Sequence, residues 1–166
     1  TAICSDTGCF AYSNVSPETF RIAAELIGYD IDHAEIARQL FNCVELSSEL
    51  LKAELTSSIH SYYGGRLRIV TADERIAEKY GVDLREVSDL VELPRRIRGT
   101  EVAVSLKYSG GKLRASLRSN GDVTVDKVAL SFGGGGHAKA AGCTIDAPSL
   151  DVAEKLIVEA FGELLV

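Results

Sequence analysis

The first third of the chain places apolar residues at the spacing of amphipathic helices. Ser16 followed by Pro17 is typical of a helix start, and apolar residues then recur every three or four positions as far as Gly28. Asp32 with Glu35 resembles a capping box and predicts a second helix. We therefore expect two short helices, each with one apolar stripe.

The pattern continues with one more long helix and then changes period. Residues 47–61 carry leucines and an isoleucine at helical spacing, which would place His60 near the carboxyl end of a third helix. Residues 67–71 read as a strand. Short helices are expected over 72–80 and 84–90.

The chain opens on a short apolar stretch, residues 1–4, which suits a strand. Such a strand would deliver Asp6 from its carboxyl end into a turn at Gly8, the edge at which open α/β sheets bind ligands. A carboxylate there could hold Mg or Mn, which prefer oxygen ligands. One aspartate makes no metal site by itself, and an aspartate that stabilises its own turn is the alternative.

Alternation of apolar and polar residues over 102–108 and 113–117 predicts a hairpin, with its turn at Gly110-Gly111. On the second strand Arg114, Ser116 and Arg118 share the face opposite the apolar one. Two guanidinium groups on one face can grip a phosphate. A solvated outer face of the hairpin is the alternative.

Four consecutive glycines, 133–136, lead into His137. A helical pattern over 125–132 runs directly into them, and a strand over 141–145 and a final helix from about 150 follow. Glycine runs let backbone N–H groups face a ligand and form a concave anion site. The run matches neither a Walker A sequence nor G-x-G-x-x-G, so a flexible hinge with a chance histidine stays open. The order of elements predicts a compact α/β fold with a mixed sheet.

Charge narrows the choice of partner. The chain of 166 residues has a net charge of −6, but residues 94–118 carry seven bases and a single acid, Glu101. An acidic whole argues against coating long nucleic acid, whereas a local basic segment favours a small anion or a short oligonucleotide. The four cysteines form no C-x-x-C pair, and we expect reduced thiols of a cytoplasmic protein. The apolar runs are too short to cross a bilayer.

Three stretches carry a family resemblance. Gly134-Gly135-Gly136-His137 with the small residues 140–142 resembles the signature of the DHHA1 domain of the DHH phosphoesterase superfamily, and 117–121 resembles the Arg-Ser element that precedes it. Residues 5–14 resemble the last motif of the catalytic DHH domain. Within the superfamily the chain is most similar to the oligoribonucleases (nanoRNases) and pAp phosphatases, often labelled exopolyphosphatase-related.

The resemblance implies a domain organisation. Residues 1–44 would be the end of a Rossmann-like DHH catalytic domain, and 45–166 a DHHA1 domain that binds substrate. Members of the family carry an Asp-His-His triplet in a half that precedes these motifs, and this sequence contains no such triplet. We therefore expect the chain to be the C-terminal half of a longer protein.

For the intact enzyme the resemblance implies a Mn²⁺-dependent phosphodiesterase or phosphatase acting on short oligoribonucleotides, pAp or both. Two Mn²⁺ ions, held partly by Asp6, would activate a water for attack on phosphorus. No catalytic residue is expected in this chain, and the isolated chain should be inactive. The substrate-binding residues that the resemblance implies are Arg118, Ser119, Gly134, Gly135, Gly136 and His137.

Three other functions stay open at this point. They are an RNA-binding DHHA1 appendage without catalysis, a cyclic-dinucleotide phosphodiesterase of the same superfamily, and an interaction module in which the glycines form a hinge. The expected partners are short RNA or nucleotide phosphates and not a membrane. Association of two copies into a homodimer is left open.

Overall fold

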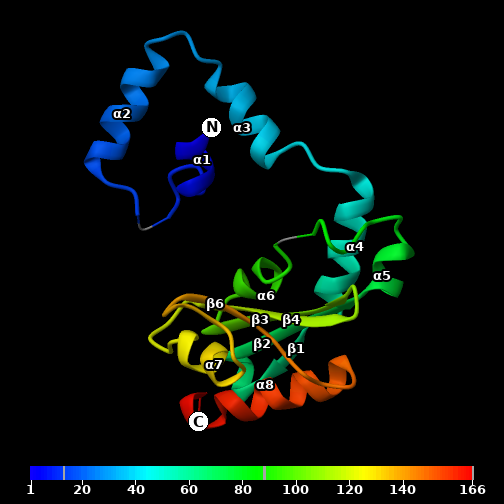
Figure 1. The fold of residues 1–166 in the computed structure, drawn as a ribbon. Coiled ribbons are helices and arrows are strands. Elements are labelled where there is room, and N and C mark those ends of the chain that lie inside the picture. Colours follow the sequence, from blue (N-terminus) through cyan, green and yellow to red (C-terminus); the bar gives the residue numbers. More distant parts are fainter. Residues whose placement is uncertain (13, 88, 166) are drawn as a thin grey trace. The chain divides into compact units, whose positions relative to one another are not determined.

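The computed structural model describes residues 1–12, 14–87 and 89–165, and the chain separates into two compact units, Thr1–Glu45 and Leu46–Val166 (Figure 1). The first unit holds the helices α1 (Ala2–Asp6), α2 (Pro17–Ile27) and α3 (His33–Phe41). None of the described helices of either unit is long and apolar enough to cross a membrane.

The starts of α2 and α3 confirm the predicted caps. The Ser16 hydroxyl accepts a hydrogen bond from the Thr19 amide at 3.3 Å, and the Thr19 hydroxyl accepts one from the Ser16 amide at 3.1 Å. The Asp32 carboxylate accepts a bond from the Glu35 amide at 2.9 Å. These bonds satisfy amide groups that have no partner within a helix, so local sequence is enough to fix both helix starts.

The strand expected over residues 1–4 is wrong, because this stretch begins α1. The amides of Ser5 and Thr7 donate to the carbonyls of Thr1 and Ile3, each at 3.1 Å. The described part of the first unit contains no strand with which an extended segment could pair. Its backbone groups are therefore satisfied by local helical bonds instead.

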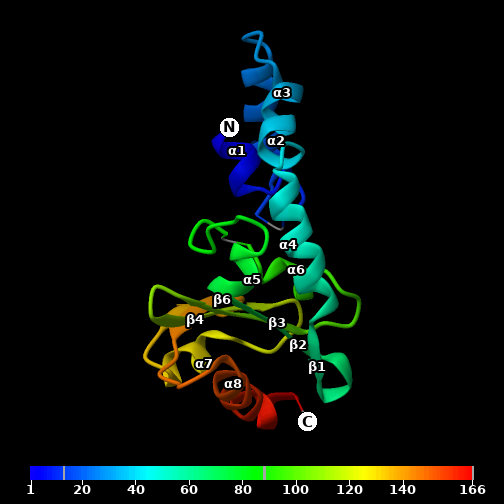
Figure 2. The same ribbon diagram turned by 90° about the vertical axis from the view of Figure 1, so that its right-hand side faces the viewer.

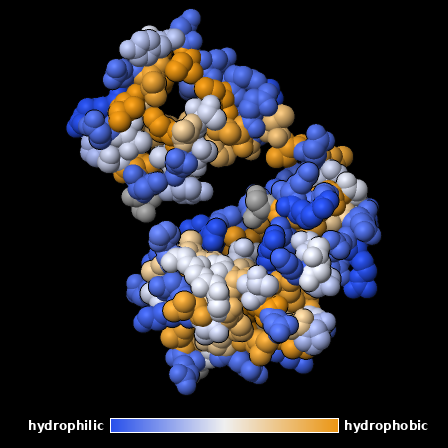
Figure 3. Space-filling model, viewed as in Figure 1, coloured by the Kyte–Doolittle hydropathy of each residue, from blue (hydrophilic) through white to orange (hydrophobic). Residues whose placement is uncertain are grey.

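Apolar side chains stay on the surface of the first unit (Figure 3). Neither α2 nor α3 has a buried residue, although both helices are strongly amphipathic. A stacked pair, Phe10 and Phe20 with ring centroids 5.2 Å apart, is the main aromatic contact. The exposed large apolar residues on α2 and α3 are Phe20, Ile22, Leu26, Ile27, Leu40 and Phe41.

The second unit is built around one sheet of six strands. In chain order it contains α4 (Leu46–Ser57), β1 (His60–Tyr62), η1 (Tyr63–Gly65), β2 (Leu67–Asp73), α5 (Glu74–Glu78), α6 (Glu92–Arg95), β3 (Val102–Ser109), β4 (Lys112–Ser119), α7 (Asp126–Ser131), β5 (Gly135–His137), β6 (Ala140–Thr144) and α8 (Leu150–Leu165). The strand order is β1-β2-β3-β4-β6-β5. Among the described strands only the pair β2 and β3 runs parallel, which confirms the predicted mixed sheet.

Two local predictions in this unit are wrong. The third helix ends at Ser57, and His60 pairs with Ile69 in the sheet instead of lying at the helix end. Residues 84–90 form turns and no helix where they are described. The ammonium group of Lys107 accounts for the second case, because it binds the carbonyls of Leu84 and Val87 at 3.2 and 2.9 Å.

The two faces of the sheet are covered differently (Figure 2). We call the face that packs on α7 and α8 the core face. Its core is apolar, and buried residues of β2, β3, β4 and β6 pack there against Ile157 and Phe161 of α8. On the opposite face α4, α5 and α6 contact β2 and β3, where Val70 and Ala72 join a second apolar cluster.

The outward positions of β4, β6 and β5 on that opposite face are at least partly exposed to solvent. They form the open face, which consists of Arg114, Ser116, Arg118, Gly135, His137, Ala140, Gly142 and Thr144. The fold therefore leaves half of one sheet face free for another use.

Candidate functional site

Arg118 and His137 lie on the same face of the sheet and in the same row across it. Arg118 of β4 pairs with Ala140 of β6, and Ala140 pairs with His137 of β5. Residues that pair across a sheet point to the same side, so both side chains belong to the open face. Two strand spacings put their Cα atoms roughly 10 Å apart.

The surface between these two side chains is lined by small residues. Ala140 stands between Arg118 and His137, and the next row of the sheet holds Gly135, Gly142 and Ser116. A Cβ atom built on Gly135 would meet nothing within 4 Å. Arg118 and His137 therefore lie on either side of a surface without bulky side chains. We call this surface, formed by Gly135, Ala140 and Gly142, the floor.

Three of the four loop glycines are required by the backbone. Gly133 has φ +73° and ends α7 in a Schellman motif, in which its amide donates to Leu130 and that of Gly134 to Ala129, both at 2.9 Å. A Cβ on Gly134 would lie 2.2 Å from the carbonyl oxygen of residue 142, and one on Gly136 would lie 2.5 Å from that of residue 140. Gly135 alone has neither a positive φ nor a close neighbour.

The glycine run is thus a helix cap followed by an edge strand, and not the concave nest of amides that the sequence suggested. The Gly134 amide is already bonded and is not free for a ligand. β5 is the last strand of the sheet and pairs only with β6. Backbone groups on its outer edge therefore lack a neighbouring strand and remain the candidates for binding an anion.

Ser119 stands apart from the other expected binding residues. Its side chain is buried, and by strand alternation it points to the side opposite Arg118. The hydroxyl donates to the Gly121 carbonyl at 3.2 Å, and the amide donates to the Lys139 carbonyl at 3.0 Å. Lys139 lies in the turn between β5 and β6, so Ser119 joins the end of β4 to the glycine hairpin.

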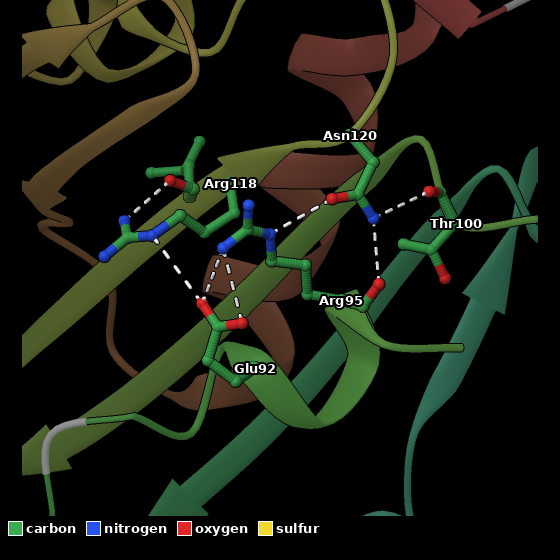
Figure 4. A network of polar contacts seen from close by, with 6 residues as sticks. Glu92, Arg95, Thr100, Arg118 and Asn120 are labelled. Atoms are coloured by element: carbon green, nitrogen blue, oxygen red, sulfur yellow. Dashed lines mark hydrogen bonds and ion pairs between the residues drawn. The ribbon is translucent and has the colours of Figure 1, made fainter. Parts of the chain in front are cut away.

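Arg118 is held by a polar network that sequence reasoning missed (Figure 4). Its Nε lies 4.0 Å from Oε1 of Glu92, and its Nη1 donates to the Leu117 carbonyl at 3.0 Å. The same Glu92 oxygen accepts a bond from Arg95 at 3.0 Å. One carboxylate of α6 therefore lies between two guanidinium groups.

Asn120 fixes α6 to the end of β4. Its side-chain oxygen accepts a bond from Nε of Arg95 at 3.0 Å, and its amide group donates to the carbonyls of Arg95 and Thr100 at 2.8 and 3.1 Å (Figure 4). The element 117–121 predicted Arg118 but gave no sign of this role for Asn120. The partners lie at 95 and 100, too far along the chain for a spacing rule to find.

The described residues do not form a metal site. Asp6 is exposed at the end of α1, and its backbone carbonyl accepts a bond from the Asn14 side chain at 3.0 Å. No group of three His, Cys, Asp or Glu side chains among the described positions could hold a metal ion. Asp6 by itself does not supply the donors that a Mn²⁺ ion needs.

Comparison with known proteins places this geometry in a family. Residues 68–163 match the DHHA1 domain. The chain is 37% identical over 165 residues to the bifunctional oligoribonuclease and PAP phosphatase NrnA of Thermus thermophilus, which covers 99% of this chain and 49% of that protein. It is 33% identical over 141 residues to a probable protein of the same name from Streptococcus mutans, covering 84% and 44% of the two chains.

A solved structure agrees with both. An exopolyphosphatase-related protein from Bacteroides fragilis superimposes with a TM-score of 0.87 at 25% identity, over 98% of this chain and 49% of that one. The chain thus spans about half the length of the curated relatives it matches. Because the match to the domain covers more than half of the sequence and includes the whole open face, the chain belongs to the DHHA1 domain family.

Proposed function

We propose that this chain is the substrate-binding half of a phosphoesterase that hydrolyses short oligoribonucleotides, pAp or both. The observation that carries the proposal is the row across the open face, in which Arg118 and His137 stand on either side of Ala140. The relatives from T. thermophilus and S. mutans, named as oligoribonuclease and PAP phosphatase, supply the substrate class.

Different residues of the open face would contact different parts of the ligand. The Arg118 guanidinium can hold a phosphate through two parallel hydrogen bonds. His137 can donate a bond to the same phosphate from the other side. The small floor formed by Gly135, Ala140 and Gly142 lets a nucleotide lie close to the backbone. The net charge of −6 opposes binding of long nucleic acid, which favours short ligands.

Mn²⁺ is part of this proposal only for the complete enzyme. A metal ion bound in the complete enzyme would polarise the phosphate of the substrate and activate a water molecule. Asp6 could contribute one oxygen ligand, but the other ligands would have to come from residues outside this chain. The chain alone would bind and orient a phosphate without hydrolysing it.

Two further features support a partner half. α2 and α3 expose apolar stripes that the described residues leave uncovered, and the curated relatives are about twice as long as this chain. We propose that a catalytic half corresponding to the rest of those relatives covers the stripes.

We also propose that the complete enzyme lies in the cytoplasm, where short RNA fragments and pAp would be available.

Binding of AMP and pAp to the purified chain, measured by calorimetry, tests the proposal. Arg118→Gln and His137→Ala should each weaken binding about tenfold, as for the loss of a charge-assisted contact of ~1.5 kcal/mol. Lys155→Gln on the exposed side of α8 is the matched control and should change nothing. Equal affinities for all four proteins would contradict the assignment of the open face.

A second measurement tests whether this chain binds the substrate without hydrolysing it. The purified chain incubated with Mn²⁺ and pAp should release no phosphate above the background of a mock purification. Hydrolysis that depends on Mn²⁺ and is lost in Asp6→Asn would show that this chain assembles a complete site, which would overturn the proposal.

A further inference from the structure

Two cations face each other on the sheet next to the proposed binding row. Lys107 of β3 pairs directly with Arg114 of β4, on the face that also carries Arg118. Like charges directly opposite each other in an antiparallel pair destabilise the sheet. Within the described residues no hydrogen bond or ion pair engages the Arg114 side chain. The pair therefore has an electrostatic cost that an anion bound beside it would reduce.

A small polar cavity lies over this pair. It has a volume of about 100 Å³ and is lined by Val87, Leu90, Ser105, Lys107, Arg114 and Ser116. The side-chain hydroxyls of Ser105 and Ser116 have no hydrogen-bond partner among the described residues. A volume of that size has room for a group as small as a phosphate.

Lys107 is fixed in position and keeps one N–H group for a ligand. Its ammonium group donates to the carbonyls of Leu84 and Val87, which uses two of its three N–H groups. Burial and the nearby charge of Arg114 both lower the pKa of Lys107, whereas Asp83 acts in the opposite direction. Asp83 is itself occupied by Arg85, whose Nη2 and Nε lie 2.6 and 3.0 Å from its oxygens.

We propose that this cavity is a second phosphate subsite, in which Lys107, Arg114 and the hydroxyl of Ser116 bind a phosphate of the same ligand that Arg118 and His137 hold. This inference rests on the proposed function. Arg114, Ser116 and Arg118 alternate along one strand, so the Cα atoms of the two arginines are about 13 Å apart. That distance exceeds one phosphodiester step, so the subsite serves a trinucleotide rather than a mononucleotide.

The test compares two ligands in two variants. Calorimetry with AMP and with the 5′-phosphorylated trinucleotide pApApA measures affinity for the wild-type chain and for Arg114→Gln. The variant should weaken binding of pApApA about fivefold to tenfold and change the affinity for AMP by less than twofold. Arg114 is exposed, and its side chain forms no hydrogen bond or ion pair within the described residues, so its replacement should leave the fold intact.

Ser116→Ala provides a second, smaller change at the same subsite, with an expected twofold to fourfold loss for pApApA alone. Lys155→Gln is again the control for a lost positive charge. Binding of pApApA unchanged in both subsite variants, or weakened equally with AMP, would overturn the subsite while Arg118→Gln still tests the main site. Failure of the wild-type chain to bind either ligand would overturn the subsite and the proposed function together.

Discussion

The two faces of β4 illustrate how one strand serves two purposes. Leu113, Ala115 and Leu117 point to the core face and are almost completely buried. Arg114, Ser116 and Arg118 alternate with them on the other face, where no apolar residue is present. The same backbone therefore supports an apolar core on one side and a basic surface on the other.

The contrast explains where the chain can carry binding residues. Along β4, β6 and β5 apolar packing is confined to the face that α8 covers, because the opposite face of these three strands is not part of either apolar cluster. Residues there are free to be small or charged without a cost to packing. The first unit shows a different situation, since none of its described apolar residues is buried.

Two neighbouring substitutions on β4 give the strongest test of the difference between its two faces. Leu117→Ala should lower the free energy of unfolding by about 2–5 kcal/mol, because Leu117 has no exposed surface and a cavity would remain. Ser116→Ala should change it by less than ~0.5 kcal/mol. Urea unfolding followed by far-UV circular dichroism measures both, and similar losses for the two variants would contradict the division between faces.

A second pair of substitutions compares two adjacent glycines of β5. Gly136→Ala should destabilise the chain by roughly 1–3 kcal/mol, because its methyl group would meet the backbone of residues 140 and 141. Gly135→Ala should be nearly neutral for stability, since its methyl group would enter open space. Thermal unfolding measures the stability of both variants. AMP binding should weaken in the stable Gly135→Ala variant, because the added methyl group would project from the floor on which the nucleotide lies.

The smallest effect concerns the carboxylate that competes for Arg118. Glu92→Gln should tighten AMP binding about twofold to fivefold, because the ion pair that a phosphate must displace is a partly exposed one of ~0.5–1 kcal/mol. Glu159→Gln on the exposed side of α8 removes the same charge elsewhere and serves as control. Weaker binding by Glu92→Gln would instead show that Glu92 orients Arg118 for the ligand.

Much of the second unit could be predicted from its sequence, because its signals are local. The Gly110-Gly111 turn fixes the hairpin register, and with it the face shared by Arg114 and Arg118. The same register places Lys107 opposite Arg114, so the sequence is enough to predict that pairing. The caps of α2 and α3 depend on residues three positions apart and were likewise readable.

The predictions were wrong or incomplete where residues distant in the sequence determine the structure. The 84–90 segment has helical spacing, but Lys107 binds its carbonyls from a strand some 20 residues away. Residues 1–4 have the composition of a strand, but a strand requires a neighbour that the sequence of the segment cannot supply. The role of Glu92 depends on how α6 packs beside β4, which no local pattern encodes.

The bond between the Ser119 amide and the Lys139 carbonyl has a consequence for affinity. It ties the turn of the β5–β6 hairpin to the strand that carries Arg118, so the separation between Arg118 and His137 is set before any ligand arrives. Little loop entropy is then lost by the protein on binding. Ligands that satisfy the same contacts should therefore rank by their own flexibility, with the stiffest nucleotide binding most tightly.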